Sequence, residues 1–150
     1  MRGPRAELSF ADSWTLPAPP DRIRDVVVDL EHWMTWWPQV LAVASLGPDD
    51  ARVIARSVLP HTLDLVLHAT CRDLPVLAVE LDGDLEGVAR WELAEDPAGT
   101  LLRYEQHVVA TGALAVACRV LRPLMRWNHD RMMAGAVAGL RALLTGEQRG

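Results

Sequence analysis

Three polar residues at apolar positions are the first candidates for chemistry in this chain. Tyr104 and Gln106 follow the alternation of Leu102 and Val108, so they are predicted to point toward the covered face of a strand. Asn128 lies on an apolar helical stripe, where an unpaired amide would cost about 1–3 kcal/mol. Tyr104 and Asn128 could each hold a ligand carbonyl, and each could equally be a core residue whose polar group is satisfied by a neighbour.

Other kinds of site are not indicated. The sequence contains no nucleophile elbow, HExxH zinc motif, phosphate-binding loop or GxGxxG dinucleotide motif. Cys71 and Cys118 are too few for a disulfide framework, and no Cys/His cluster predicts a metal site. We therefore expect no metal and no organic cofactor. His68 and His107 alternate with the apolar residues of their strands, so we expect them on the solvent-facing side.

Tryptophan dominates the aromatic residues, with six Trp against one Tyr and one Phe. Trp33, Trp36 and Trp37 are spaced so that they share one helical face. They either pack a short helix onto the core or form a wall against which a flat ligand stacks. Met132 and Met133 would add adaptable, polarisable surface to the same wall.

Length and composition describe one domain, residues 1–150. The chain is half apolar, and its net charge of −5 with scattered arginines argues against a nucleic-acid partner, which needs a basic stripe. No run of about 18 uncharged apolar residues predicts an integral membrane segment. The N-terminus, MRGPRAELSF, lacks the apolar region of a secretory signal. We expect a cytoplasmic monomer or homodimer.

The elements that must position these residues are one strand, two short helices, six more strands and a long helix. The first strand is predicted at 7–16, a helix from Asp21 to about Leu30, and a second helical segment over 31–37. Beyond Val40 the period changes to two, and short connections predict an antiparallel meander. Its strands are expected near residues 40–46, 51–59, 62–72, 76–82, 85–94 and 100–111.

The last segment, 113–144, has helical periodicity over roughly eight or nine turns. Pro123 interrupts it, so the long helix either begins near Arg122 or is kinked there. Its apolar stripe is predicted to contain Leu121, Leu124, Asn128, Met132, Gly139 and Leu143. The strand at 85–94 should point Trp91 and Leu93 toward this helix, with Arg90 and Glu92 in solvent.

The order of elements and several local motifs resemble the START/Bet v 1-like (SRPBCC) superfamily, in particular its polyketide cyclase/dehydrase and lipid-transport domains. The motifs are WTLPAPPDRI at 14–23, WMTWWP at 33–38, GDLEG at 83–87 with WEL at 91–93 and GT at 99–100, and WNHD at 127–130. The resemblance covers essentially the whole chain. It implies an α+β helix-grip fold, in which a seven-stranded curved antiparallel sheet surrounds a long C-terminal helix, with two short helices between strands 1 and 2.

The resemblance also implies a ligand cavity between sheet and helix, typically several hundred Å³ in such folds. Small residues there should leave space unfilled, namely Ala69, Ala89, Ala110, Ala136 and Gly139. Aromatase/cyclases of the family are thought to hold a substrate carbonyl with a cavity arginine, for which Arg56 is the candidate here. Arg56 could equally be a solvated strand residue, and a bulge near Pro60 would invert its direction. His129, beside Asn128, either lines the cavity or reaches the sheet edge or solvent.

Three functional hypotheses remain open. The first is an enzyme that binds a polyketide-like or aromatic molecule for intramolecular aldol cyclisation and dehydration. The second is a non-enzymatic carrier or sensor of lipid-like small molecules, and the third is an interaction protein whose pocket is closed by side chains. Converging polar groups would favour the enzyme, whereas a uniformly apolar tunnel would favour the carrier. The catalytic candidates are Arg56, Tyr104 and Asn128, and the ligand-binding candidates are Trp33, Trp36, Trp37, Trp91, Gln106, His129 and Met132.

Overall fold

We describe a computed structural model, which covers residues 3–56 and 62–149, with side chains as far as residue 146. The elements in chain order are β1 (Arg5–Leu16), α1 (Pro20–Val28), the 3₁₀-helix η1 (Leu30–Thr35), β2 (Val40–Ser45), β3 (Asp50–Arg56), β4 (Thr62–Cys71), β5 (Val76–Gly83), β6 (Leu85–Asp96), β7 (Gly99–Thr111), α2 (Gly112–Val120) and α3 (Arg122–Arg149). Among the described residues, none of these helices has the length and apolar character needed to cross a bilayer.

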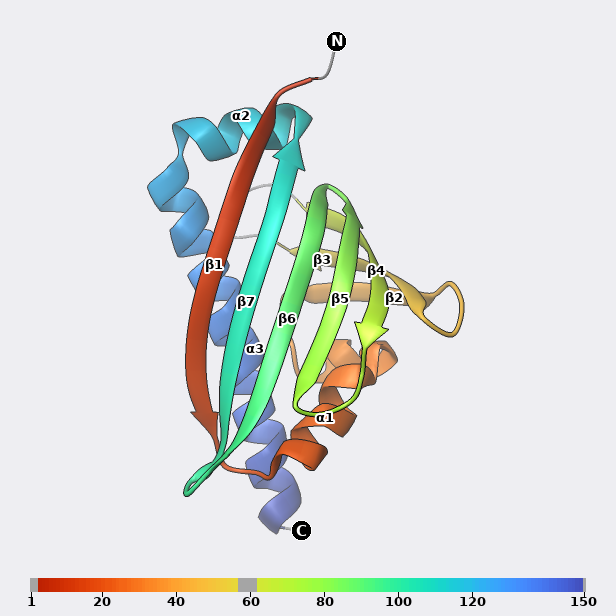
Figure 1. Ribbon diagram of the computed structural model, residues 1–150, viewed down its shortest axis with the longest axis vertical. Helices are drawn as coiled ribbons and strands as arrows, with labels where there is room; N and C mark the ends of the chain where they lie inside the picture. The colour runs from red at the N-terminus through yellow and green to blue at the C-terminus, as the bar shows by residue number, and fades with distance from the viewer. Residues whose placement is uncertain (1–2, 57–61, 150) are drawn as a thin grey trace.

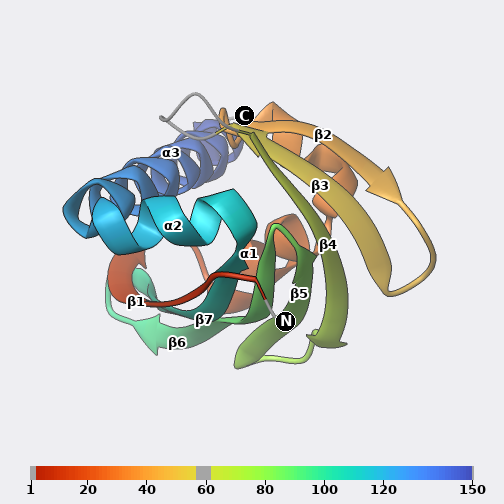
Figure 2. The same ribbon diagram turned by 90° about the horizontal axis from the view of Figure 1, so that it is seen from above.

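The strands form one antiparallel sheet with the order β1-β7-β6-β5-β4-β3-β2 (Figure 1). The sheet curls, and α3 lies across its concave face with α2 beside it (Figure 2). This is the helix-grip arrangement that the sequence predicted. Because β1 pairs with β7, the first and last strands are neighbours, and Asp12 lies opposite Tyr104.

The alternation predicted for the strands is confirmed on β6. Trp91 and Leu93 are buried on the concave side, whereas Arg90 is exposed and Glu92 is partly exposed. Register shifts occur in the β2–β3 and β4–β5 pairings, while the β3–β4 pairing is regular up to Arg56 opposite Thr62. The predicted end of β3 at 57–59 and the possible bulge near Pro60 lie outside the described residues.

The helical C-terminal segment is two helices. Of the two alternatives at Pro123, a helix that begins near Arg122 is confirmed: α3 starts there, and the preceding residues form the separate helix α2. Proline is tolerated in the first turn because its missing N–H would have no helical partner there. The predicted stripe is correct at Asn128, which is buried, and wrong at Leu121, which is exposed. Leu124, Met132, Gly139 and Leu143 are only partly buried. The residues buried on α3 are Met125, Asn128, His129, Met133, Ala136, Val137, Leu140 and Leu144. Adjacent apolar pairs such as Leu124–Met125 made the two stripes nearly equivalent in sequence.

The role predicted for Gly139 is also wrong. It leaves no unfilled space, because a Cβ atom at this position would lie 1.6 Å from the backbone oxygen of Trp36. The glycine instead lets α3 pack directly against the backbone that follows η1. The close approach fixes the tryptophan segment on the helix.

Candidate functional site

A cavity of about 150 Å³ lies between the concave face of the sheet and the helices α2 and α3. Its position is the one expected, and its volume is smaller than the several hundred Å³ expected. The largest group of lining residues is aliphatic and comes from β3, β4, β5 and β6. At the η1–β2 end the lining includes Trp33, Trp37 and Val40, which we call the tryptophan wall.

Four polar side chains line the cavity on the side away from the tryptophan wall, near the β1–β7 edge of the sheet. Tyr104 and Gln106 come from β7, and Asn128 and His129 come from α3. All four are buried, and we call them the polar wall. They meet because β7 is next to the edge strand β1, and α3 lies over this side of the sheet (Figure 2).

The Tyr104 hydroxyl group is a hydrogen-bond donor inside the cavity. It donates to Oε1 of Gln106, and the ring packs edge-on against Trp91 with centroids 5.4 Å apart. Burial raises the pKa of Tyr104, and the nearby negative charge of Asp12 raises this pKa further. The hydroxyl therefore stays protonated near neutral pH and can donate a hydrogen bond, but it cannot serve as a base.

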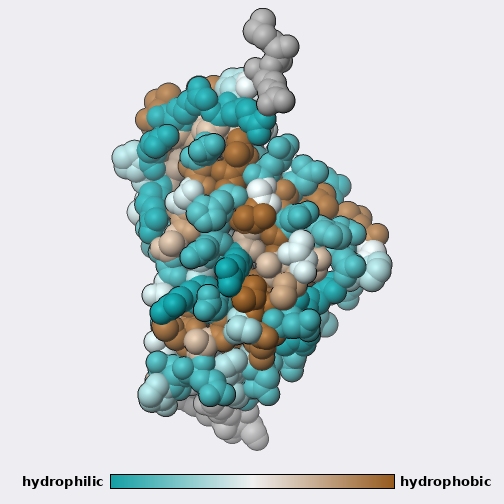
Figure 3. Space-filling model, in the orientation of Figure 1, coloured by the Kyte–Doolittle hydropathy of each residue, from teal (hydrophilic) through white to brown (hydrophobic). Residues whose placement is uncertain are grey.

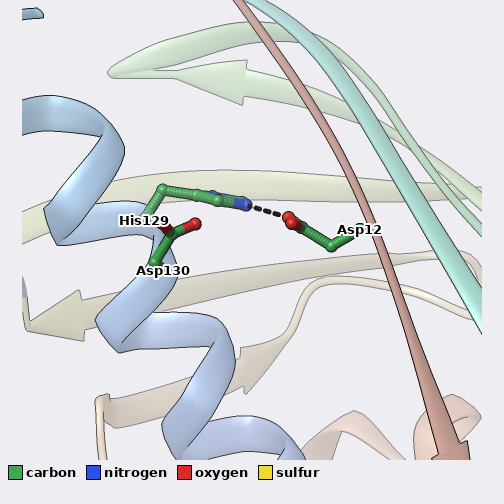
Figure 4. A group of neighbouring side chains, drawn as sticks. All are labelled: Asp12, His129 and Asp130. Atoms are coloured by element: carbon green, nitrogen blue, oxygen red, sulfur yellow. Dashed lines mark hydrogen bonds and ion pairs between the residues drawn. The ribbon is translucent and has the colours of Figure 1, made fainter. Parts of the chain in front are cut away.

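His129 is held by stacking and by a carboxylate. Its ring lies 3.8 Å from the Phe10 ring at 9°, and its Nε2 is 3.3 Å from Oδ2 of Asp12 (Figure 4). Burial lowers the pKa of His129, and this effect outweighs the hydrogen bond to Asp12, which raises the pKa. A neutral imidazole whose Nε2 proton is donated to Asp12 keeps a lone pair on Nδ1. In that tautomer Nδ1 is the atom able to accept a proton.

Asp12, His129 and Asp130 bring three potential metal-ligand atoms within 4.8 Å of one another (Figure 4). Arg126 already serves as the cation for both carboxylates, with ion pairs of 3.1 Å to Asp12 and 3.2 Å to Asp130. A metal ion at this position would have to compete with the guanidinium group. We therefore interpret the group as an ion-pair network that fixes Asp12 behind His129.

The match with a known family spans nearly the whole chain. The family model described as "Polyketide cyclase / dehydrase and lipid transport" matches residues 7–146. The chain belongs to this family. No curated protein matches the sequence.

Solved structures share the fold of this polyketide cyclase/dehydrase family member at low sequence identity. A START superfamily protein from Mycobacterium smegmatis is 18% identical, with a TM-score of 0.71 over 92% of this chain and 98% of its own. The protein TTHA0849 from Thermus thermophilus is 15% identical, with a TM-score of 0.70 over 92% and 99%. The Zhui aromatase/cyclase from a Streptomyces species is 13% identical, with a TM-score of 0.67 over 92% of both chains. At these identities the likeness shows the fold alone.

Two of the predicted site residues do not line the cavity of this family member. Arg56 is exposed at the end of β3, on the face opposite Ala55. The alternation places Ala51, Val53 and Ala55 inside, so the expectation of a cavity arginine at Arg56 is wrong. Trp36 is buried, but it packs behind Trp33 and Trp37 and is not part of the lining.

The remaining predicted residues do line the cavity: Tyr104, Asn128, Trp33, Trp37, Trp91, Gln106, His129 and Met132. His68 and His107 are exposed, as expected, and are hydrogen-bonded to Asp50 and Ser9. The structure thus brings together the polar and aromatic candidates and separates them from Arg56.

Sequence reasoning missed Asp12 and the contribution of α2. Asp12 has inward parity between Phe10 and Trp14, an unusual position for a carboxylate, and this was the available signal. Its pairing with His129 could not be predicted, because it depends on how β1 and α3 meet. Leu114 and Cys118 of α2 also line the cavity.

Proposed function

We propose that this chain binds a hydrophobic, polyketide-like or aromatic small molecule in the cavity and promotes its intramolecular aldol cyclisation and dehydration. The observation that supports this most is the presence of Tyr104, Asn128 and His129 together in an otherwise apolar cavity. A purely apolar lining would suffice for passive storage, whereas hydroxyl, amide and imidazole groups in one cavity can bind a carbonyl oxygen and transfer protons. The family description and the aromatase/cyclase with the same fold agree with this proposal.

Each proton in the proposed reaction has a donor or acceptor on the polar wall. Neutral His129 takes a proton from a carbon between two carbonyl groups of the ligand. The carbanion forms a carbon–carbon bond with a third carbonyl group. The oxygen of that group accepts hydrogen bonds from Asn128 and from Tyr104, whose hydroxyl exchanges Gln106 for the ligand, and it receives the proton from His129. His129 then removes the second proton from the same carbon and returns it to the new hydroxyl group, which leaves as water.

The cavity restricts the size of the ligand. Its volume of about 150 Å³ is on the scale of a cavity that binds one benzene molecule. A larger molecule must displace flexible side chains, and Met125, Met132 and Met133 are the lining residues best suited to this. We therefore propose that the ligand presents one flat ring, or a folded chain that becomes one, to the polar wall.

A second candidate function is a non-enzymatic carrier or sensor of lipid-like molecules. The observation that favours it is the internal pairing of the polar wall. Both groups have partners within the protein, because the Tyr104 hydroxyl donates to Gln106 and His129 is hydrogen-bonded to Asp12. Groups that are already satisfied would leave a cavity that binds by apolar contact alone.

Turnover and binding, measured separately, distinguish the two candidates. A planar aromatic compound should quench tryptophan fluorescence and raise the melting temperature, because it binds only the folded state. For an enzyme, a linear poly-β-ketone should also be converted to an aromatic product faster than in buffer, as followed by absorbance. Binding without acceleration would favour the carrier. The absence of quenching and of thermal stabilisation across a series of hydrophobic compounds would refute both.

The cellular setting that we propose is the cytoplasm, with the chain acting as a monomer or homodimer. Both cysteines, Cys71 and Cys118, are free thiols, and this is compatible with a reducing compartment. Light scattering of the purified chain would determine the oligomeric state.

A further inference from the structure

The corner where α2 meets α3 exposes large apolar side chains that point away from the cavity. Val116 is 49% exposed, Val120 73%, Leu121 43% and Trp127 47%. Figure 3 shows apolar surface at this end of the molecule, at the upper left where α2 lies in Figure 1. We call these four residues the corner patch. Scattered exposed apolar residues are ordinary, but these four gather near one junction: Val116 and Val120 lie one turn apart on α2, Leu121 joins α2 to α3, and Trp127 lies near the start of α3.

Arginines surround the corner patch. Arg119, Arg122 and Arg131 are exposed, and the Arg131 guanidinium lies 5.8 Å from the centre of the Trp127 ring. Arg126 is also exposed, but Asp12 and Asp130 balance its charge. These four arginines against two carboxylates give the corner a net positive charge in a chain whose net charge is −5. The local charge is thus opposite in sign to that of the whole molecule.

We propose that the corner patch docks this protein on the surface of an anionic lipid bilayer. The apolar side chains would enter the boundary between headgroups and acyl chains, and the arginines would contact the anionic headgroups. Tryptophan is enriched at this boundary because its ring is apolar and its N–H is polar. No helix that spans the bilayer is needed for such peripheral attachment.

A second copy of the chain fits the corner patch less well. A twofold dimer places the same surface on both sides of the interface. Arg119, Arg122 and Arg131 of one copy would then face the same arginines of the other, which is unfavourable. An anionic bilayer has the complementary charge, so the charge distribution favours lipid over self-association.

Docking would bring the cavity close to the membrane. Cys118 and Leu114 of α2 line the cavity, while Val116 and Val120 of the same helix belong to the corner patch. One helix therefore separates the lipid surface from the ligand site. This geometry is independent of whether the cavity performs catalysis.

Vesicle co-sedimentation of the full chain tests the proposal. We expect binding to vesicles of phosphatidylcholine mixed with phosphatidylglycerol, little binding to phosphatidylcholine alone, and release at high salt. Arg119→Gln and Arg122→Gln should each weaken binding about fivefold, the factor that corresponds to roughly 1 kcal/mol per surface arginine. Trp127→Ser and Val120→Ser should also weaken it. Matched controls far from α2 are Arg90→Gln on the outer face of β6 and Leu46→Ser at the β2–β3 hairpin, which should bind as the unaltered chain does.

Three outcomes of this assay would contradict the proposal. Absence of binding to the anionic vesicles at low salt would overturn it, and this result needs no variant. Binding that the corner variants and the controls affect equally would assign the attachment to another surface. A dimer that Trp127→Ser disperses, without vesicle binding, would assign the corner patch to a second copy. Because the assay contains no ligand, its failure would leave the proposed function of the cavity intact.

Discussion

The polar wall and the tryptophan wall lie toward opposite edges of the sheet, beside β7 and β2, and differ in what they offer a ligand. On the tryptophan wall, the indole N–H groups of Trp33 and Trp37 donate to the backbone oxygens of Val27 and Met132, so the rings present apolar surface. On the polar wall, hydroxyl, amide and imidazole groups line the cavity. One wall can select a ligand by shape, and only the other can move protons on it.

The difference also lies in how the chain builds each wall. The tryptophan wall comes from one short stretch, Trp33 to Val40, whose rings pack against one another and are tied to α3 by the hydrogen bond from Trp37 to Met132. The polar wall needs β7 and α3, and Asp12 on β1 supports it from behind. Its geometry therefore depends on the complete fold. Substitutions that loosen the fold should harm chemistry before they harm the apolar contact surface.

The largest expected effect on stability is that of Trp91→Ala, which removes the ring behind Tyr104. Trp91 is buried and its ring contacts Tyr104 edge-on, so the substitution should lower the free energy of unfolding by about 3–5 kcal/mol. Equilibrium urea denaturation measures this. The matched control Trp127→Ala removes an exposed tryptophan and should change stability by about 0.5 kcal/mol or less. A loss below about 1 kcal/mol for Trp91→Ala would contradict the inward packing.

The two walls should respond differently in steady-state kinetics. His129→Gln removes the proposed base and should lower kcat by about 10²–10⁴-fold while the ligand still binds. Trp37→Leu removes stacking surface and should weaken binding more than it lowers kcat. Equal loss of kcat in both variants would show that the chemistry is not confined to the polar wall.

The pH dependence should follow the lowered pKa of His129. Its imidazole stays neutral in the folded protein below the ordinary pKa of 6.5, so turnover should persist there and fall only on further acidification. The unfolded chain takes up a proton at this residue below about pH 6.5 and the folded chain does not, so His129 should lower stability as the pH falls below that value. Melting temperature against pH, for the unaltered chain and for His129→Gln, measures this contribution.

His68 provides the opposite case as a control. Its hydrogen bond with Asp50 raises the pKa of His68, so its stabilising contribution is present at low pH and is lost as the pH rises through the raised pKa. The effect should be small because the pair is exposed. If His129→Gln and His68→Gln shifted the pH profile in the same direction, the assignment of a buried, neutral His129 would be contradicted.

The smallest expected effect is that of Arg56→Gln. Because Arg56 is exposed on the outer face, the substitution should change stability by about 0.5 kcal/mol or less and leave ligand binding and kcat unchanged. Isothermal titration and steady-state kinetics provide the check. A large loss of kcat would return Arg56 to the catalytic candidates and contradict the observed strand orientation.

The sequence predicted the elements and the strand alternation because those depend on local periodicity. It placed Tyr104 and Gln106 on the concave side because β7 alternates regularly. Three features could not be predicted from the sequence, for physical reasons. Neighbouring apolar pairs left the buried face of α3 ambiguous, the close approach at Gly139 depends on backbone contact between distant segments, and Asp12 meets His129 only through long-range packing.

The proposed chemistry depends most directly on the Tyr104 hydroxyl as a donor to the ligand. Tyr104→Phe keeps the ring but leaves the Gln106 carbonyl unpaired, so the double variant Tyr104→Phe/Gln106→Leu is the better test because it removes both partners of the bond. For this double variant we predict a dissociation constant for a planar aromatic ligand close to that of the unaltered chain. Its kcat should fall by about 10²–10³-fold, as for loss of one oxyanion donor. The single variant Gln106→Leu, which retains the hydroxyl, should keep most of the turnover. Unchanged kcat in the double variant, on a substrate that the unaltered chain converts, would contradict the proposed role of the polar wall.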